Sequence, residues 1–538
     1  MTAGSPPSGR HSVPVRQPHP WFDPAPAPRR AAPAPPPRTP VPAPGAVGRP
    51  SVPTARPVPT ARPVPTPRPV PTARPVTAPR PVGPPRPPAP PRPAGPSRPP
   101  GPGRHTALPV RTEPETVQLR LAEIGRPAAP RPARRRGGSA APSRITSLDG
   151  LRGTAALVVV IYHVCLVQPF LAAPHLDPEA PLGAAEWLAT FTPLHLVWAG
   201  PEAVFVFFVL SGLVLALPVA DTGRLNLRDY YPRRLLRLYL PVWAAVVLAV
   251  AWATAFPRTW QDGDSWWLKA NVTDPTAAKV FADLLLVWSP GQANHVLWSL
   301  QWEVVYCLLL PLVLLVVRPF PRLWAGKLLA VLAAIVVGAS VGSLALSSLS
   351  LFVLGTLMAV EHRRLAAWAR RVQGSPRARL WWTAGLGTCA TLLLSYWVVH
   401  AVGVPEHMVA GAEHVARALQ GLGAAGAVFL VWQWPTAQNA MTTPVMQWLG
   451  SRSFSLYLVH LPIAASVAVG LGGQPPLPIA LALTLVLALP ATELFYRFVE
   501  RPSHLVARRA GRAVARRAPR PAHQPRPMLA STRDHALA

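Results

Sequence analysis

Three titratable side chains stand inside or at the edge of long apolar stretches, where a charged group is costly to place and is therefore a candidate for function. Arg152 and His163 belong to the run SLDGLRGTAALVVVIYHV, and Glu303 is the only carboxylate in HVLWSLQWEVVYCLLL. A spacing of eleven residues predicts that Arg152 and His163 project from one helix face, roughly 17 Å apart along the axis. Histidine takes up protons near neutral pH, and a carboxylate can orient it or receive the proton. We therefore predict proton-transfer chemistry, with the alternative that these residues only reach the membrane surface or bond neighbouring helices.

Further polar side chains are candidates because they share a helix face with another polar residue. Tyr457 and His460 in GSRSFSLYLVHLP are three residues apart, and Tyr306 has the same spacing from Glu303. Ser211 lies in the apolar run FVLSG. Each is a candidate site residue, and the alternative in each case is an interhelical hydrogen bond or simple packing.

Two arginines, Arg234 and Arg237, lie in RDYYPRRLLRLYLP, where the third apolar stretch begins. Guanidinium groups bind phosphates through paired hydrogen bonds. The pair therefore indicates a phosphate site, and the alternative is the ordinary excess of basic residues on the cytoplasmic side of a membrane protein.

Ten apolar stretches, most of them near the ~20 residues that cross a bilayer as a helix, follow from Arg144 onward. The chain is 50% hydrophobic and only 14% charged, whereas soluble proteins are about 25% charged. The pattern predicts an all-α, polytopic membrane helix bundle of about ten spans. The expected spans are 151–171, 200–219, 237–256, 296–317, 327–347, 348–361, 380–400, 411–432, 448–470 and 477–497.

The lysines and arginines of the connecting loops predict the orientation of this bundle. Arginines crowd the loops after the second, fourth and sixth spans, whereas 172–199 has no Lys or Arg and 257–295 has three. Basic loops stay in the cytoplasm. We therefore expect a multi-pass protein of the cell membrane with both termini in the cytoplasm.

The two ends of the chain differ in composition from the expected membrane domain, 145–505. Residues 1–144 are rich in Pro and Arg, 506–538 are basic, and both are expected to be disordered cytoplasmic tails. A six-residue repeat places arginines at regular intervals along the first tail. The repeat could bind Pro-recognising domains or anionic lipid, and the alternative is that the tail is only a stiff spacer. We assign the net charge of +31 to membrane contact and expect no nucleic-acid partner. The three cysteines show no metal-ligand spacing, so no metal is expected.

Six stretches carry a resemblance to the acyltransferase 3 family of bacterial membrane O-acyltransferases, over roughly residues 144–505. In family order they are LDGLRGTAALVVVIYHV, FVFFVLSGLVLAL, RRLLRLYLP, LWSLQWEVVY, SRSFSLYLVHLP and FYRFVERP. The resemblance implies transfer of an acyl group, commonly acetyl, from cytoplasmic acyl-CoA to a hydroxyl of a carbohydrate or glycosylated acceptor. It also implies activity for the counterparts of Arg152 and His163, an Arg-x-x-Arg motif at Arg234 and Arg237, and a match at Glu303.

The mechanism expected from this resemblance uses His163 as the base for the acceptor hydroxyl, with Glu303 orienting it or accepting the proton. Arg152, Arg234 and Arg237 would bind the phosphates of the coenzyme. Direct transfer and an acyl-enzyme both stay open. The acceptor is open as well, since the chain lacks the esterase-like domain that some members append.

Two other classes of protein stay open at this stage. One is a proton-coupled transporter or flippase of a glycan or lipid-linked sugar, which predicts internal repeats that the sequence does not convincingly show. The other is an inactive scaffold whose Pro-Arg tail recruits partners.

Overall fold

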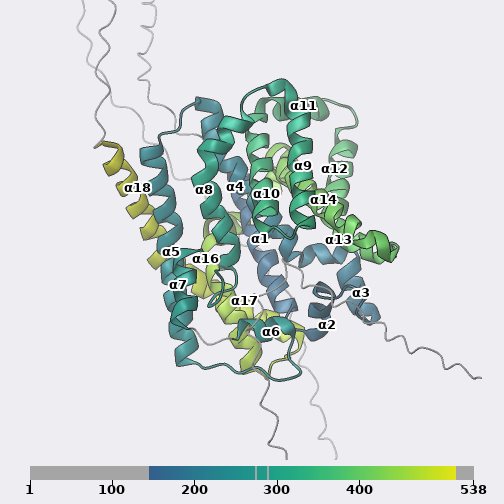
Figure 1. Cartoon of the computed structure of the whole chain (residues 1–538), viewed down its shortest axis with the longest axis vertical. Helices are drawn as coiled ribbons and strands as arrows, with labels where there is room; N and C mark the ends of the chain where they lie inside the picture. Colours follow the sequence, from purple (N-terminus) through teal and green to yellow (C-terminus); the bar gives the residue numbers. More distant parts are fainter. Residues whose placement is uncertain (1–144, 273–275, 288–289, 517–538) are drawn as a thin grey trace, which may run out of the picture. The chain divides into compact units, whose positions relative to one another are not determined.

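The computed structural model describes residues 145–272, 276–287 and 290–516, which form helices and connecting loops without a strand (Figure 1). The expected all-helical class is confirmed for this part of the chain. The predicted disorder and repeat of residues 1–144, and the predicted disorder of 517–538, lie outside the described residues.

Eight helical segments in the described ranges are long and apolar enough to cross a membrane. They are α1 (Thr146–Cys165), α4 (Gly200–Thr222), α5 (Leu227–Ala255), α8 (Leu297–Val317), α9 (Trp324–Ser340, after the turn η3, Pro321–Leu323), α14 (Glu406–Gln433), α16 (Pro444–Gly470), and α17 (Leu477–Phe495) with its continuation. Two bent pairs qualify only when each is taken together: α10 (Leu344–Val360) with α11 (His362–Gln373), at 70°, and α12 (Ala378–Leu393) with α13 (Ser395–Ala401), at 66°. The expected number of about ten spans lies at the upper end of this range of eight to ten.

The other helices are short and belong to the connections. They are α2 (Pro169–Ala172), η1 (Ala173–His175), α3 (Ala184–Phe191), η2 (Pro193–Val197), α6 (Trp266–Asn271), α7 (Ala277–Leu285) and α15 (Pro435–Met441). α6 contacts α2 and α16, and the indole Nε1 of Trp266 donates to the carbonyl of Ala172 at 2.8 Å. The long connection between α5 and α8 is thereby folded onto the end of α1 and α2.

Close backbone packing joins α1 to α16. A Cβ on Gly153 would stand 2.5 Å from the backbone N of Gly450, and a Cβ on Gly450 would stand 2.2 Å from the carbonyl oxygen of Asp149. Only glycine permits such an approach, as in the small-residue interfaces of membrane helices. These glycines therefore determine how near the side chains of α1 and α16 come to each other.

Several expected helix boundaries are wrong: the first span, expected at 151–171, is Thr146–Cys165, and two others differ for identifiable local reasons. The break between the fifth and sixth spans is at 341–343 rather than after 347, because Gly342 adopts a φ of +65° and the Ser343 hydroxyl accepts the N–H of Leu346 at 3.3 Å. The third span begins at Leu227 rather than at 237, since Asn226 caps it by accepting the N–H of Arg228 at 3.2 Å. The Arg-x-x-Arg pair therefore lies inside a helix.

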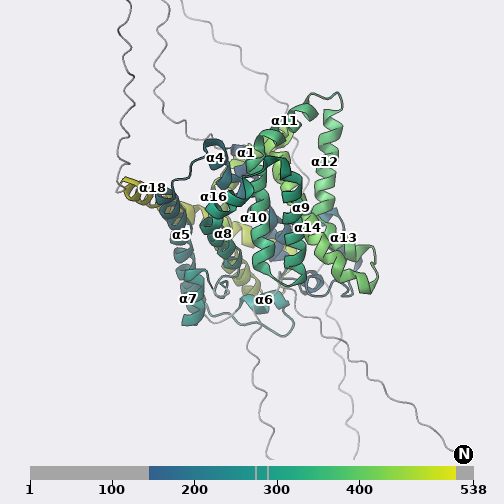
Figure 2. The same cartoon turned by 45° about the horizontal axis from the view of Figure 1, so that its top comes forward.

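The expected disordered tail from 506 is also wrong for its first eleven residues, because they belong to α18 (Arg501–Arg516). α18 follows α17 through a π-helical turn, η4 (Tyr496–Glu500), and lies beside α5 (Figure 1, Figure 2). Its buried residues are small: Ser503, Ala507 and Gly511. A Cβ on Gly511 would stand 2.9 Å from the carbonyl oxygen of Asp229 on α5. A basic but amphipathic sequence thus forms a docked helix.

Candidate functional site

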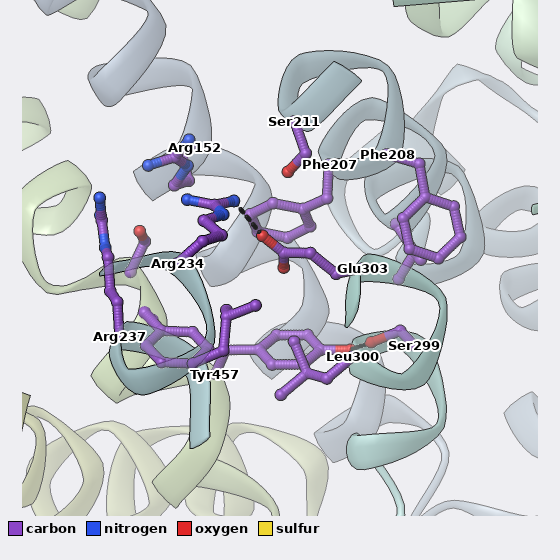
Figure 3. Close-up of a pocket in the computed structure, with 14 residues that line it drawn as sticks. Arg152, Phe207, Phe208, Ser211, Arg234, Arg237, Ser299, Leu300, Glu303 and Tyr457 are labelled. Carbon is purple, nitrogen blue, oxygen red and sulfur yellow. Dashed lines mark hydrogen bonds and ion pairs between the residues drawn. The ribbon is translucent and has the colours of Figure 1, made fainter. Parts of the chain in front are cut away.

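A cavity, here called the basic chamber, lies among α1, α4, α5, α8 and α16. Its charged lining residues are Arg152, Arg234, Arg237 and Glu303, so three guanidinium groups face one carboxylate. Figure 3 shows the three arginines gathered on one side and the ring of Tyr457 along another wall. An excess of fixed positive charge in a partly enclosed cavity favours an anionic ligand such as a phosphate.

One ion pair organises this lining. The Nη2 of Arg234 lies 2.6 Å from the Oε1 of Glu303, and its Nε donates to the Sγ of Cys307 at 3.4 Å. Both contacts join α5 to α8. The side chains of Arg234 and Glu303 are only 16% and 18% exposed, so water screens their attraction weakly. Arg152 and Arg237 make no ion pair with any described residue.

A second cavity, the aromatic chamber, lies toward the other end of α1. His163 and His295 line it together with the rings of Tyr162, Trp266, Trp267 and Trp298. The rings of His163 and Trp267 are stacked, with centroids 5.5 Å apart. None of the described residues that line this chamber is Ser, Thr or Cys.

The two chambers meet at Val204 and Tyr457, which line both. The Tyr457 hydroxyl is 2.7 Å from the Ser299 Oγ and 3.3 Å from the carbonyl oxygen of Val296. The ring is therefore tied to the start of α8 and divides the two cavities.

Behind the aromatic chamber, His163 on α1 contacts His460 on α16. The Nδ1 of His163 is 2.9 Å from the Nε2 of His460, and the Nδ1 of His460 is 2.9 Å from the carbonyl oxygen of Leu456. His460 is fully buried and His163 is 8% exposed. This arrangement holds a histidine at a chamber wall through a second histidine and a backbone carbonyl.

The family profile of acyltransferase 3, described as an acyltransferase domain, matches residues 145–496. The chain belongs to the acyltransferase 3 family. It therefore transfers acyl groups other than aminoacyl groups, and its apolar helices fit a multi-pass membrane protein.

Three relatives are named as acyltransferases. Acyltransferase MdmB of Streptomyces mycarofaciens is 28% identical over 351 residues, which are 60% of this chain and 79% of the relative. Acyltransferase clz18 of Cochliobolus lunatus is 25% identical over 393 residues (59% and 82%). Acyltransferase R4 of Phoma sp. is 24% identical over 449 residues (68% and 95%). No solved structure matches the chain.

Most of the residues predicted for this acyltransferase line the two chambers or stand behind them. Arg152, Arg234, Arg237, Glu303 and Ser211 line the basic chamber, His163 the aromatic chamber, and Tyr457 both, with His460 behind His163. Tyr306 lies apart, because its hydroxyl bonds the Thr356 Oγ1 and its buried ring stacks on Phe352. The hypothesis that Glu303 orients His163 does not fit this arrangement, since Glu303 bonds Arg234 and His163 bonds His460.

Sequence reasoning missed His295 and the tryptophans of α6, because they come from a polar connection rather than from an apolar span. His295 is held next to Gly291, whose φ of +103° and missing Cβ allow the close approach. Burial lowers the pKa of His295 to about 4, against an opposing hydrogen bond to Gly291, so the ring is neutral at pH 7. The aromatic chamber therefore contains a neutral histidine in addition to His163.

Sequence reasoning also missed Asp283, which organises the segment before α8. Its fully buried carboxylate accepts four backbone N–H groups, from Gly291 and Gln292 on Oδ1 and from Ala293 and Asn294 on Oδ2, at 2.5–3.3 Å. The Asn294 side chain in turn donates to the carbonyl of Leu458 on α16 at 2.8 Å. Asp283 thus fixes the backbone that presents His295, a contact with no local signal in the sequence.

Proposed function

We propose that this acyltransferase moves an acetyl group from cytoplasmic acyl-CoA to a hydroxyl of a carbohydrate or glycosylated acceptor. The observation that carries the proposal is the pair of adjoining chambers, one lined by three arginines and one by His163. Phosphates suit the first, and a base suits the second. The spacing of Arg152 and His163 on α1, roughly 17 Å, matches the need to hold the phosphates away from the reacting thioester.

The orientation proposed for the membrane is consistent with this assignment. The three arginines of the basic chamber lie within about the first three turns of α1 and α5, which begin at the end of the bundle where the loops carry most of their arginines. Positive charge marks the cytoplasmic side, where acyl-CoA is found. The aromatic chamber then lies toward the far side, under the connection that carries α6 and α7, from which an acceptor would enter.

In the proposed reaction, His163 removes the proton from the acceptor hydroxyl as the oxygen attacks the thioester carbonyl. The C–S bond of the resulting tetrahedral intermediate breaks, and the departing thiolate takes the proton back from His163. The described lining of the aromatic chamber holds no Ser, Thr or Cys, which supports direct transfer over an acyl-enzyme on such a residue. Arg152, Arg234 and Arg237 would hold the donor by its phosphates.

The test uses the full chain in nanodiscs with radiolabelled acetyl-CoA and a panel of methyl glycosides and a glycosylated antibiotic. We expect labelled product from the wild type, about 10²–10⁴-fold less from His163→Ala, and unchanged product from His407→Ala, an exposed histidine on α14. We expect Arg152→Gln to raise the donor KM, with the exposed Arg322→Gln as its control. A wild type that neither binds nor consumes the donor would overturn the coenzyme assignment and favour the transporter alternative.

A further inference from the structure

We propose that His460 is a positioning residue that determines which ring nitrogen of His163 is basic. The inference deepens the proposed function, in which His163 takes the acceptor proton. It depends on two contacts: the bond between the two histidines, and the bond from His460 to a backbone carbonyl.

The hydrogen-bond network assigns the tautomers in sequence. A carbonyl oxygen only accepts, so the Nδ1 of His460 must carry a hydrogen to bond the carbonyl of Leu456 at 2.9 Å. In a neutral imidazole the other nitrogen then has a lone pair, so the Nε2 of His460 is an acceptor. The Nδ1 of His163, 2.9 Å away, must therefore be the donor. The remaining nitrogen of His163, Nε2, is left unprotonated.

This nitrogen is free to act on a ligand. His163 lines the aromatic chamber, and no described residue makes a hydrogen bond to its Nε2. Stacking on Trp267 fixes the plane of the ring, and the close packing of α1 on α16 at Gly153 and Gly450 keeps the two histidines in contact. The basic nitrogen is thus presented by both its hydrogen bond and its packing.

The pair of His163 and His460 also stabilises the positive charge that His163 acquires when it takes the acceptor proton. When the Nε2 of His163 takes the acceptor proton, the resulting imidazolium donates from Nδ1 to the neutral Nε2 of His460, which makes a stronger, charge-assisted bond. The charge is then shared by a pair that ends at a carbonyl dipole, and the same proton leaves with the thiolate. Glu303, the carboxylate expected from the sequence to be the partner of His163, is engaged by Arg234. A histidine and a backbone carbonyl therefore fill the place that a carboxylate has in other base–orienter pairs.

Two substitutions of His460 separate positioning from simple packing. His460→Gln keeps an acceptor oxygen near the place of Nε2, and His460→Leu removes it. We expect Leu to lower kcat about 10- to 100-fold, the size of effect seen when the hydrogen-bond partner of a metal-bound histidine is removed, with the KM for acetyl-CoA unchanged. We expect Gln to recover most of this loss. If Leu fails to fold, the unbranched His460→Met replaces it, and His407→Gln on α14 is the matched surface control.

A spectroscopic measurement tests the same inference without any turnover. Solid-state NMR of full-length protein labelled with ¹⁵N-histidine in nanodiscs, compared with His163→Gln for assignment, should show His163 protonated at Nδ1. In His460→Leu this signal should move toward the Nε2-protonated form. Protonation of wild-type His163 at Nε2, or equal kcat for Gln and Leu, overturns the inference. Absence of acetyl-CoA turnover with the expected ¹⁵N pattern overturns only the proposed function.

Discussion

The hydroxyl of Tyr457 on α16 lies 2.7 Å from the Oγ of Ser299 on α8, at the boundary between the basic and aromatic chambers. This bond holds an aromatic ring across the only place where the described linings of the two cavities share residues, next to Val204. A donor with phosphates in one chamber and its acyl group in the other must pass this ring. The ring of Tyr457 therefore separates the arginines from the histidines, and its hydroxyl bonds Ser299 and the carbonyl of Val296 rather than a described residue of either set.

Two substitutions of Tyr457 should distinguish the role of its ring from the role of its hydroxyl hydrogen bond. Tyr457→Phe keeps the ring and costs about 1 kcal/mol of stability through the lost hydrogen bond. Tyr457→Ala opens the boundary, so we expect more butyryl-CoA consumption relative to acetyl-CoA and more donor hydrolysis relative to transfer. Free labelled acid and labelled product measure this ratio. Tyr239→Phe on α5, which loses a bond to the carbonyl of Leu285, is the control, and equal ratios in all variants would contradict a dividing role.

The Arg234–Glu303 ion pair should behave as one unit in a double-mutant cycle. Glu303→Gln leaves Arg234 partly buried without its anion, so we expect a loss of about 2 kcal/mol in the free energy of unfolding, below the 3–5 kcal/mol of a fully buried pair. The double substitution with Arg234→Gln should cost less than the sum of the two single changes. Thermal unfolding in nanodiscs measures the coupling. Strictly additive losses would show that the pair contributes nothing beyond its separate contacts.

A side chain at Gly450 should destabilise the protein, because its Cβ would meet the backbone of α1 rather than a movable side chain. We expect Gly450→Ala to lower the free energy of unfolding by about 1–3 kcal/mol and to reduce kcat by separating His163 from His460. Gly411→Ala on α14, where nothing lies within 4 Å of the new Cβ, should be neutral or stabilising by up to about 1 kcal/mol. Activity assays and thermal unfolding of the two variants make the comparison, and similar effects of both would contradict the packing argument.

Asp283→Asn should loosen the segment that presents His295. The amide has one acceptor oxygen in place of two, and its NH₂ group would face two N–H donors, each worth about 1–3 kcal/mol if left unbonded. We expect faster hydrogen exchange at residues 291–294 and lower turnover, with binding of acetyl-CoA at the basic chamber retained. Asp262→Asn, an exposed carboxylate in the same connection, is the control. Unchanged exchange at 291–294 would remove Asp283 from the positioning of this segment.

The sequence by itself determined the helical class, the approximate number of spans and the polar residues worth attention. These features are local, since apolar length and Lys/Arg placement reflect what a bilayer requires of each segment separately. Arg152, Arg234 and Arg237 could be named in advance for this reason, and the basic chamber is lined by all three.

Only the tertiary structure decided which polar groups are partners. Helix periodicity gives the face on which a side chain lies but not the neighbouring helix it meets, so Glu303 bonds Arg234, and His163 bonds His460 across 297 residues of sequence. Glycine contacts between α1 and α16 bring His163 and His460 together. Asp283 accepts hydrogen bonds from four backbone N–H groups, and no spacing of residues in the sequence predicts this turn. The basic segment Arg501–Arg516 forms the helix α18 because its small residues pack against α5. Each of these outcomes depends on packing between distant segments, which the local pattern of residues does not contain.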